Sequence, residues 1–162
     1  MERSTLRLRP LRVADEIPFR HAFDEFKEKE PEWLFAFHFE ESMAFAEYIR
    51  RLGCWSKGQE LPEKFVPNTF LVGVVGNTII GRVSIRHELN EFLLQYGGHV
   101  GYGVVSSQRN RGYATQMLRL TLPIAGQLGI ARILVTCDED NLASRRVIEK
   151  NGCSAGRYTD ST

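Results

Sequence analysis

The chain has 162 residues, a hydrophobic content of 43% and a formal net charge of +1 at pH 7. This length and composition predict one domain with a single substantial core. The nearly neutral charge excludes the basic surface that nucleic-acid binding normally needs, and no apolar run reaches the roughly 18 residues of a membrane span. We therefore expect a protein that acts on small or peptidic ligands, with no nucleic-acid or membrane partner.

The cysteines and the first residues predict the compartment. Cys54, Cys137 and Cys153 are odd in number and widely spaced, and the opening sequence MERSTLRLRP lacks the apolar core of a secretion signal. We expect free thiols and a cytoplasmic protein. No metal is predicted, because paired metal-ligand spacing does not occur among the histidines, His21, His38, His87 and His99.

Hydrophobic periodicity predicts an ordered series of strands and helices. Leucines alternate with arginines at the start of the chain, as in a half-buried strand, and Gly76-Asn77 between two β-rich runs predicts a hairpin. A long loop is expected before the hairpin. In chain order the elements are a strand at 4–9, helices at 13–29 and 40–52, strands at 69–75, 78–87 and 99–105, a helix at 112–129, a strand at 130–137 and a helix at 141–150.

The segment 98–114 combines a strand, a polar turn and the start of a helix, and this order predicts an anion site. The free N–H groups and the positive dipole end of a helix N-terminus favour a phosphate. Arg109 and Arg111 add positive charge, and Gly112 permits a close backbone approach. The alternative is an ordinary solvated turn with two surface arginines.

Two motifs resemble the GNAT family of acetyl-CoA-dependent N-acetyltransferases. Residues 109–114, RNRGYA, match the signature Gln/Arg-x-x-Gly-x-Gly/Ala, whose loop binds the coenzyme A pyrophosphate in that family. Residues 141–152 are similar to the Asn-x-x-Ser…Glu-Lys-x-Gly helix of the same family. The resemblance implies an α+β fold with a central, mostly antiparallel mixed sheet flanked by helices. Its fourth and fifth strands, 99–105 and 130–137, would splay apart to receive the pantetheine arm.

The resemblance also implies a single GNAT domain over 1–162, with one departure from the family at its end. The family follows its last helix with a two-stranded hairpin, whereas residues 153–162 suffice for one short strand. A missing last strand would leave the edge at 130–137 unpaired. We expect a partner subunit in a homodimer, an inserted segment or a shortened chain to cover this edge.

The resemblance assigns residues to acetyl-CoA. The main chain of Gly103, Val104 or Val105 would polarise the thioester at a bulge, as an oxyanion hole does. Asn141 would cap its helix and touch the pantetheine arm, although capping alone also explains it. Backbone and side-chain contacts to the pyrophosphate would come from the signature loop, Arg109, Asn110, Arg111, Gly112, Tyr113 and Ala114.

The residues at the acid and base positions match the family pattern less well than those of the donor site. His99 stands where many members have a glutamate base, and an imidazole can accept a proton near neutrality. The equal alternative is a packed strand histidine. Ile148 replaces the family's tyrosine acid, while Ser144 matches a serine of the ribosomal-protein acetyltransferase subgroup that would protonate or hydrogen-bond the sulfur. A serine that satisfies backbone groups in the first helical turn is its alternative.

Together these features predict an N-acetyltransferase that moves the acetyl group of acetyl-CoA to a primary amine in a ternary complex. The alternative is a non-catalytic acyl-CoA-binding module or sensor that acts through partner contact. Glutamates and aromatic residues alternate between 25 and 48. They predict either an acidic, aromatic-walled mouth for a cationic amine or solvated helix faces above an aromatic core.

Overall fold

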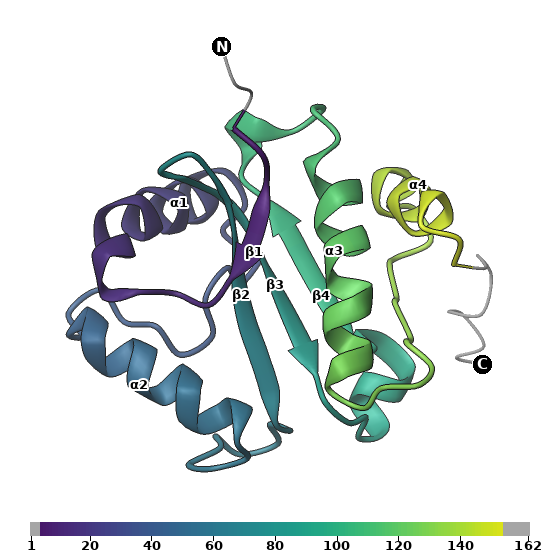
Figure 1. Cartoon of the computed structure of the whole chain (residues 1–162), viewed down its shortest axis with the longest axis horizontal. Helices are drawn as coiled ribbons and strands as arrows, with labels where there is room; N and C mark the ends of the chain where they lie inside the picture. The colour runs from purple at the N-terminus through teal and green to yellow at the C-terminus, as the bar shows by residue number, and fades with distance from the viewer. Residues whose placement is uncertain (1–3, 154–162) are drawn as a thin grey trace.

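The computed structural model describes residues 4–153, which form a central sheet with a pair of helices on each face (Figure 1). All but the first residue of the expected last strand, 153–162, lie outside this range. Among residues 4–153 no helix is both long and apolar enough to cross a bilayer. The strands are β1 (Arg7–Arg9), β2 (Asn68–Val75), β3 (Thr78–Arg86) and β4 (Val100–Val104), and the helices are α1 (Glu16–Lys29), α2 (Phe45–Ser56), α3 (Tyr113–Gln127) and α4 (Leu142–Lys150).

The four-stranded sheet has the order β1-β2-β3-β4, and every neighbouring pair is antiparallel. The hairpin between β2 and β3 is confirmed, because Val75 pairs with Thr78 across a turn in which Gly76 has a φ of 61°. Such a left-handed backbone is the conformation that glycine adopts without steric cost.

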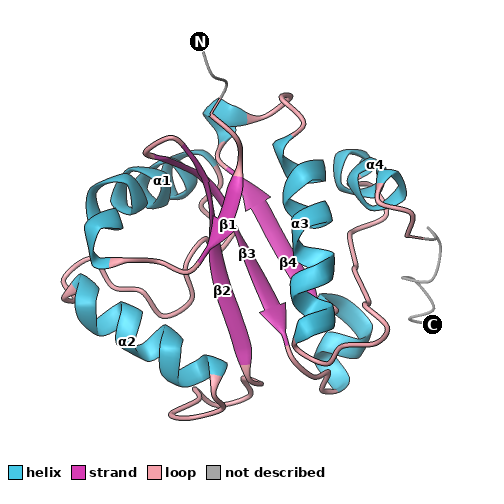
Figure 2. Cartoon of the chain, in the orientation of Figure 1, coloured by secondary structure: helices cyan, strands magenta, loops and turns pink. Residues whose placement is uncertain are grey.

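The sheet is buried on both faces, with α1 and α2 on one side and α3 and α4 on the other (Figure 2). Side chains alternate across the sheet: Phe70 and Val72 pack toward α1 and α2, and Leu71 packs with Met117 of α3. The sheet therefore separates the molecule into two half-cores, and β4 borders both.

Aromatic residues build the half-core under α1 and α2. Phe19 is fully buried, and its ring centroid lies 5.7 Å from Phe35, 5.1 Å from Phe39 and 5.2 Å from Phe45. Rings at these separations gain contact energy beyond area burial. Phe35 and Phe39 are therefore core residues, which was one of the two readings of the aromatic run.

The second helix was predicted five residues too early. It begins at Phe45 and continues through Gly53 to Ser56. Glycine inside a helix costs roughly 1 kcal/mol relative to alanine. Burial of Trp55, which is 3% exposed and donates its indole N–H to Glu60 O at 3.1 Å, offsets that cost and extends the helix by a turn.

The segment 130–137, predicted as a strand, does not form a ladder in the part of the chain that the structure describes. Its single β-bridge is parallel and joins Val100 to Val135. The segment contacts β4 only where β4 begins. The repeated backbone hydrogen bonds that define a strand therefore do not form between them. A π-helical turn at Leu93–Gly97, which has no signal in the hydrophobic pattern, precedes β4.

Candidate active site

The free edge of β4 carries the backbone groups nearest to the predicted donor site. Arg86 N donates to His99 O at 2.7 Å, and Val105 N donates to Ile80 O at 2.9 Å. Antiparallel strands exchange such bonds at alternate residues, so the odd-numbered residues of β4 bond to β3. Tyr102 and Val104 therefore direct their N–H groups away from β3.

The hydrogen-bond pattern of β4 reduces the number of candidates for the predicted oxyanion donor. The N–H groups of Gly103 and Val105 point toward β3, whereas the N–H of Val104 points toward the free edge. The expected bulge is absent from β4, because its register with β3 runs from Ile85–Val100 to Gly81–Val104 without a shift. Of the three candidates, Val104 alone has the required orientation.

The free edge opens immediately after one point of contact with the segment 130–137. His99 N donates to Leu134 O at 2.7 Å, and Val100 bridges Val135. Beyond this bridge no backbone bond between 102–104 and the segment 130–137 occurs in the structure. The two backbones thus separate on the way to the loop before α3, as predicted for splayed strands.

The loop after β4 presents the N-terminus of α3. Ser106–Gln108 form a 3-10 turn, and Asn110 and Gly112 have φ angles of 61° and 79°. Asparagine and glycine are the residues that adopt this left-handed region most readily. Among residues 4–153 no side chain caps α3, so the N–H groups of its first turn are available to an anion.

The two arginines of the loop have different surroundings. Arg109 donates from Nε to Val104 O at 3.0 Å, forms an ion pair with Glu30 and lies over the Phe26 ring. It therefore joins β4, the loop and the end of α1. Arg111 is exposed and forms no ion pair or side-chain hydrogen bond within residues 4–153, so its guanidinium is available to a ligand.

Several glutamates of the N-terminal region are engaged in ion pairs and hydrogen bonds. Glu25 accepts from Ser107 N at 2.6 Å, which ties α1 to the loop before α3. Glu41 pairs with Lys27 at 2.5 Å, and Glu47 pairs with Arg50 at 2.8 Å. These contacts favour solvated, paired helix faces over the acidic mouth that the sequence allowed.

His99 is held by the backbone of the facing segment. Its Nδ1 accepts from Leu134 N at 2.9 Å, so the neutral ring carries its hydrogen on Nε2. Burial, and secondarily the nearby charge of Arg86, lower the pKa of His99. Accepting a proton at Nδ1 would break the bond to Leu134, and this geometry favours the packed role of the histidine.

Ser144 meets a second hydroxyl that the sequence did not single out. Tyr102 OH lies 2.7 Å from Ser144 Oγ, and Asn141 Oδ1 caps α4 by accepting from Ser144 N at 3.1 Å. Burial raises the pKa of Tyr102, so its phenol stays protonated at neutral pH. Burial also raises the pKa of Cys137, which keeps that thiol protonated. Alternation along β4 could have placed Tyr102 on this face, but not its contact with α4.

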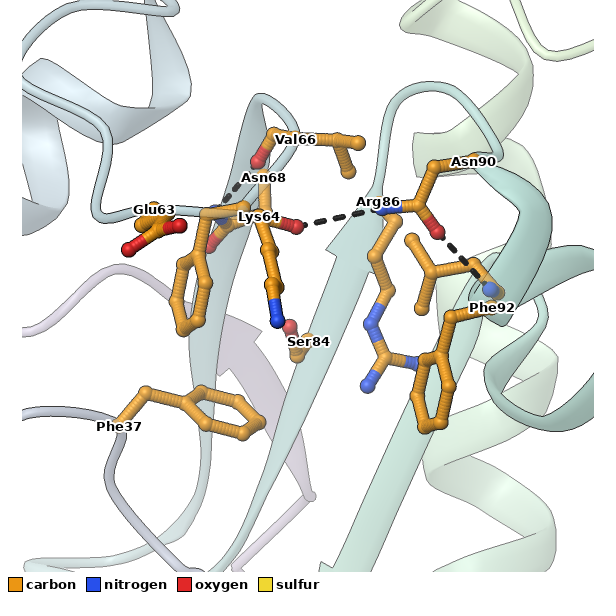
Figure 3. Close-up of a pocket in the computed structure, with 11 residues that line it drawn as sticks. Phe37, Glu63, Lys64, Val66, Asn68, Ser84, Arg86, Asn90 and Phe92 are labelled. Carbon is orange, nitrogen blue, oxygen red and sulfur yellow. Dashed lines mark hydrogen bonds between the residues drawn. The ribbon is translucent and has the colours of Figure 1, made fainter.

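A cavity of about 620 Å³ opens at the end of the sheet where β2 begins and β3 ends, on the face that packs against α1 and α2 (Figure 3). It lies between the loop before β2 and the π-helical turn after β3. Polar side chains from the sheet and aromatic side chains from the loops line it, among them Phe37, Phe65, Asn68, Ser84, Arg86 and Phe92. Within residues 4–153 no group of three or more His, Cys, Asp or Glu side chains is arranged for a metal.

Solved acetyltransferases share the fold of this chain. RimJ of Mycobacterium smegmatis, in complex with a CoA disulfide, is 17% identical, with a TM-score of 0.59 and coverage of 89% of this chain and 68% of the other. The Salmonella typhimurium acetyltransferase that modifies the N-terminal serine of a 50S ribosomal subunit protein is 18% identical, with a TM-score of 0.61 and coverage of 91% and 80%. At these identities the likeness shows the fold.

Comparison of the sequence with known proteins and family models shows the family as well as the fold. No curated protein matches the chain. The family model for the acetyltransferase (GNAT) domain matches residues 5–154, which is nearly the whole chain. With the loop before α3, the splayed edge of β4 and the shared fold, this match shows that the chain belongs to the GNAT family of acetyl-CoA-dependent acetyltransferases.

Proposed function

We propose that this protein transfers the acetyl group of acetyl-CoA directly to a primary amine of a small molecule or peptide in a ternary complex. The observation that carries the proposal is the free edge of β4. It runs from the Val100–Val135 bridge past the N–H groups of Tyr102 and Val104 to the N-terminus of α3. Donor and acceptor can reach this edge from opposite faces of the sheet.

The donor binds by its pyrophosphate at the loop. The first-turn N–H groups of α3, with the charge of Arg111 and the close approach at Gly112, bind the phosphates. Tyr113, Ala114 and the Asn110 backbone complete this turn. Arg109 positions the loop through Val104 and Glu30.

In the transfer step the amine nitrogen bonds to the thioester carbon and the carbon–sulfur bond breaks. The Val104 N–H stabilises the developing oxyanion, a contribution of about 10²- to 10³-fold. The departing thiolate receives a proton from the paired hydroxyls of Tyr102 and Ser144, which regain a proton from water. The amine loses its proton to water, and amide and free coenzyme A are the products.

The peptide acceptor has support from the relatives. One acts on the N-terminal serine of a ribosomal protein, which is a peptide α-amine. We place the whole chain, 1–162, in one domain. The three free cysteines fit the cytoplasm, and a homodimer would cover the edge at 130–137. Solution scattering that gives the mass of a monomer at working concentration would remove the homodimer.

The test combines acetyl-CoA titration with a panel of primary amines and short peptides. Coenzyme A release that depends on an amine, with a mass gain of one acetyl group on that amine, supports the proposal. Binding of acetyl-CoA without release for any acceptor supports the alternative, a non-catalytic acyl-CoA-binding module or sensor.

A further inference from the structure

Two arginines of β3 lie on the α1/α2 face of the sheet, and within residues 4–153 neither has a carboxylate partner. Arg82 is 3% exposed, with its guanidinium 4.1 Å from the Trp33 ring centroid. It donates to Phe35 O at 2.9 Å and to Leu34 O at 2.6 Å. Backbone carbonyls therefore accept the hydrogen bonds of the Arg82 guanidinium, and this side chain has a structural role.

Arg86 is different, because most of its donors are free. Within the same residues one side-chain hydrogen bond is present, from Nη1 to Gly97 O at 3.1 Å. The guanidinium lies flat on Gly101, where an added Cβ would stand 3.0 Å to 3.3 Å from its atoms. Burial lowers the pKa of Arg86, which reflects a charge removed from water without a counter-ion.

The cavity gives Arg86 a ligand-sized space. Its guanidinium points into the interior, near Asn68 and Ser84 of the sheet (Figure 3). A volume of about 620 Å³ falls within the range of small-molecule sites. The walls are mainly aromatic and aliphatic, formed by Phe37, Phe65, Val66, Phe92 and Leu93. The exposed, charged residues Glu63 and Lys64 also line the cavity, and Arg86 is its half-buried cation. A guanidinium among mainly apolar walls favours a ligand with one anionic end and an apolar body.

We propose that the acceptor of this enzyme is an aromatic or aliphatic amine that carries a carboxylate, and that Arg86 binds this carboxylate in the cavity. The proposal rests on the acetyl-transfer function proposed above. Arg86 lies over Gly101, three residues from Val104 on the same strand, a span of roughly 10 Å. The Trp33 ring covers Gly103 between these two positions, so a molecule anchored at Arg86 passes beside that ring to reach the free edge where the thioester carbonyl binds.

The test compares pairs of amines that differ only in the carboxylate, phenylalanine against 2-phenylethylamine and tryptophan against tryptamine. Wild-type protein is expected to use the amino acids with a kcat/KM about 10- to 100-fold higher, the range of a hydrogen-bonded charge pair. Arg86→Met should remove this preference and leave the kcat/KM of the plain amines within about threefold. Equal use of both members of each pair by the wild type would overturn the proposal.

A binding measurement keeps the result separate from catalysis. Isothermal titration with N-acetylphenylalanine, the product of transfer, should show binding to the wild type and to Arg119→Met, which alters an exposed arginine of α3. Arg86→Met should weaken it about 10- to 100-fold. If Arg86→Met unfolds, Arg86→Lys retains the charge without the bidentate fork and should show an intermediate loss.

The two proposals fail differently. If peptides are acetylated and neither amino acid reacts or binds, the carboxylate assignment is wrong and acetyl transfer stands. If N-acetylphenylalanine binds through Arg86 but no amine releases coenzyme A, acetyl transfer is wrong and the carboxylate site stands. Loss of activity in Arg86→Met toward both members of each pair, with unchanged product binding, would overturn the role of Arg86.

Discussion

The phenolic oxygen of Tyr102 lies 2.7 Å from Oγ of Ser144, and this contact joins the middle of β4 to the first turn of α4. Asn141 fixes Ser144 from the other side by capping the helix. Tyr102 lies in the α3/α4 half-core, whereas Arg86 packs on the opposite face of β4 at Gly101. The hydroxyl pair and the cavity that contains Arg86 therefore lie on opposite faces of β4, on either side of its free edge.

Tyr102→Phe should lower kcat by about 10- to 100-fold, because the thiolate loses a positioned proton donor. The KM for acetyl-CoA should stay within about threefold, since the phosphates bind elsewhere. Steady-state kinetics of Tyr102→Phe, Ser144→Ala and the double variant measure the coupling. If the hydroxyls act as a unit, the double variant is no slower than the slower single variant. Fully additive losses, or an unchanged kcat in Tyr102→Phe, would contradict the role.

Arg111→Ala and Arg109→Ala should have separable effects. Arg111 is exposed and unpaired within residues 4–153, so its removal should weaken coenzyme A binding about 10-fold without altering the melting temperature. Arg109 binds Val104 O and Glu30, and its removal should lower the melting temperature as well. Titration calorimetry and thermal melting distinguish them. Equal affinities for wild type and Arg111→Ala would exclude Arg111 from the phosphate site.

The stability of the protein should fall when the pH is lowered from 7 toward 5, partly because of His99. Burial lowers the pKa of His99 in the folded state, so the unfolded chain takes up a proton first as the pH falls below the ordinary value of 6.5. The neutral ring thus stabilises the fold above that pH. Burial also lowers the pKa of His87, which adds to the same trend.

His99→Gln should therefore reduce, but not abolish, the difference between melting temperatures at pH 7.5 and pH 5.5. Because Nδ1 is occupied by Leu134 N, we expect kcat/KM at pH 7.5 to change by less than about threefold. A loss near 10²-fold with unchanged acetyl-CoA affinity would instead establish His99 as the base.

Arg82→Met should lower the free energy of unfolding by about 3–5 kcal/mol. The substitution leaves the carbonyls of Phe35, Leu34 and Gly101 without their donors in a buried site. Urea denaturation measures the loss. Arg119→Met, at an exposed position of α3, is the matched control and should stay within about 0.5 kcal/mol of the wild type. Similar stabilities for the two variants would show that these hydrogen bonds contribute little.

Local sequence patterns correctly predicted features that depend on contacts between residues close together in the chain. The hairpin at Gly76 and the cap of α4 by Asn141 depend on residues within three positions, and both are confirmed. Positions that depend on distant partners were predicted less well. The segment 130–137 has the composition of a strand, yet only Val135 finds a bridging partner, because β4 separates from the rest of the segment.

The sequence by itself determined the family and most of the order of elements, since short motifs and periodicity are local, and it predicted the pyrophosphate loop. Only the tertiary structure decided which backbone N–H faces the free edge, since the register between β3 and β4 orients Val104 outward. It also brought Tyr102 to Ser144 across 42 positions and placed Arg86 at a cavity with no ion-pair partner among residues 4–153. Contacts between residues far apart in the chain arise from packing, so a pattern read along the chain does not contain them.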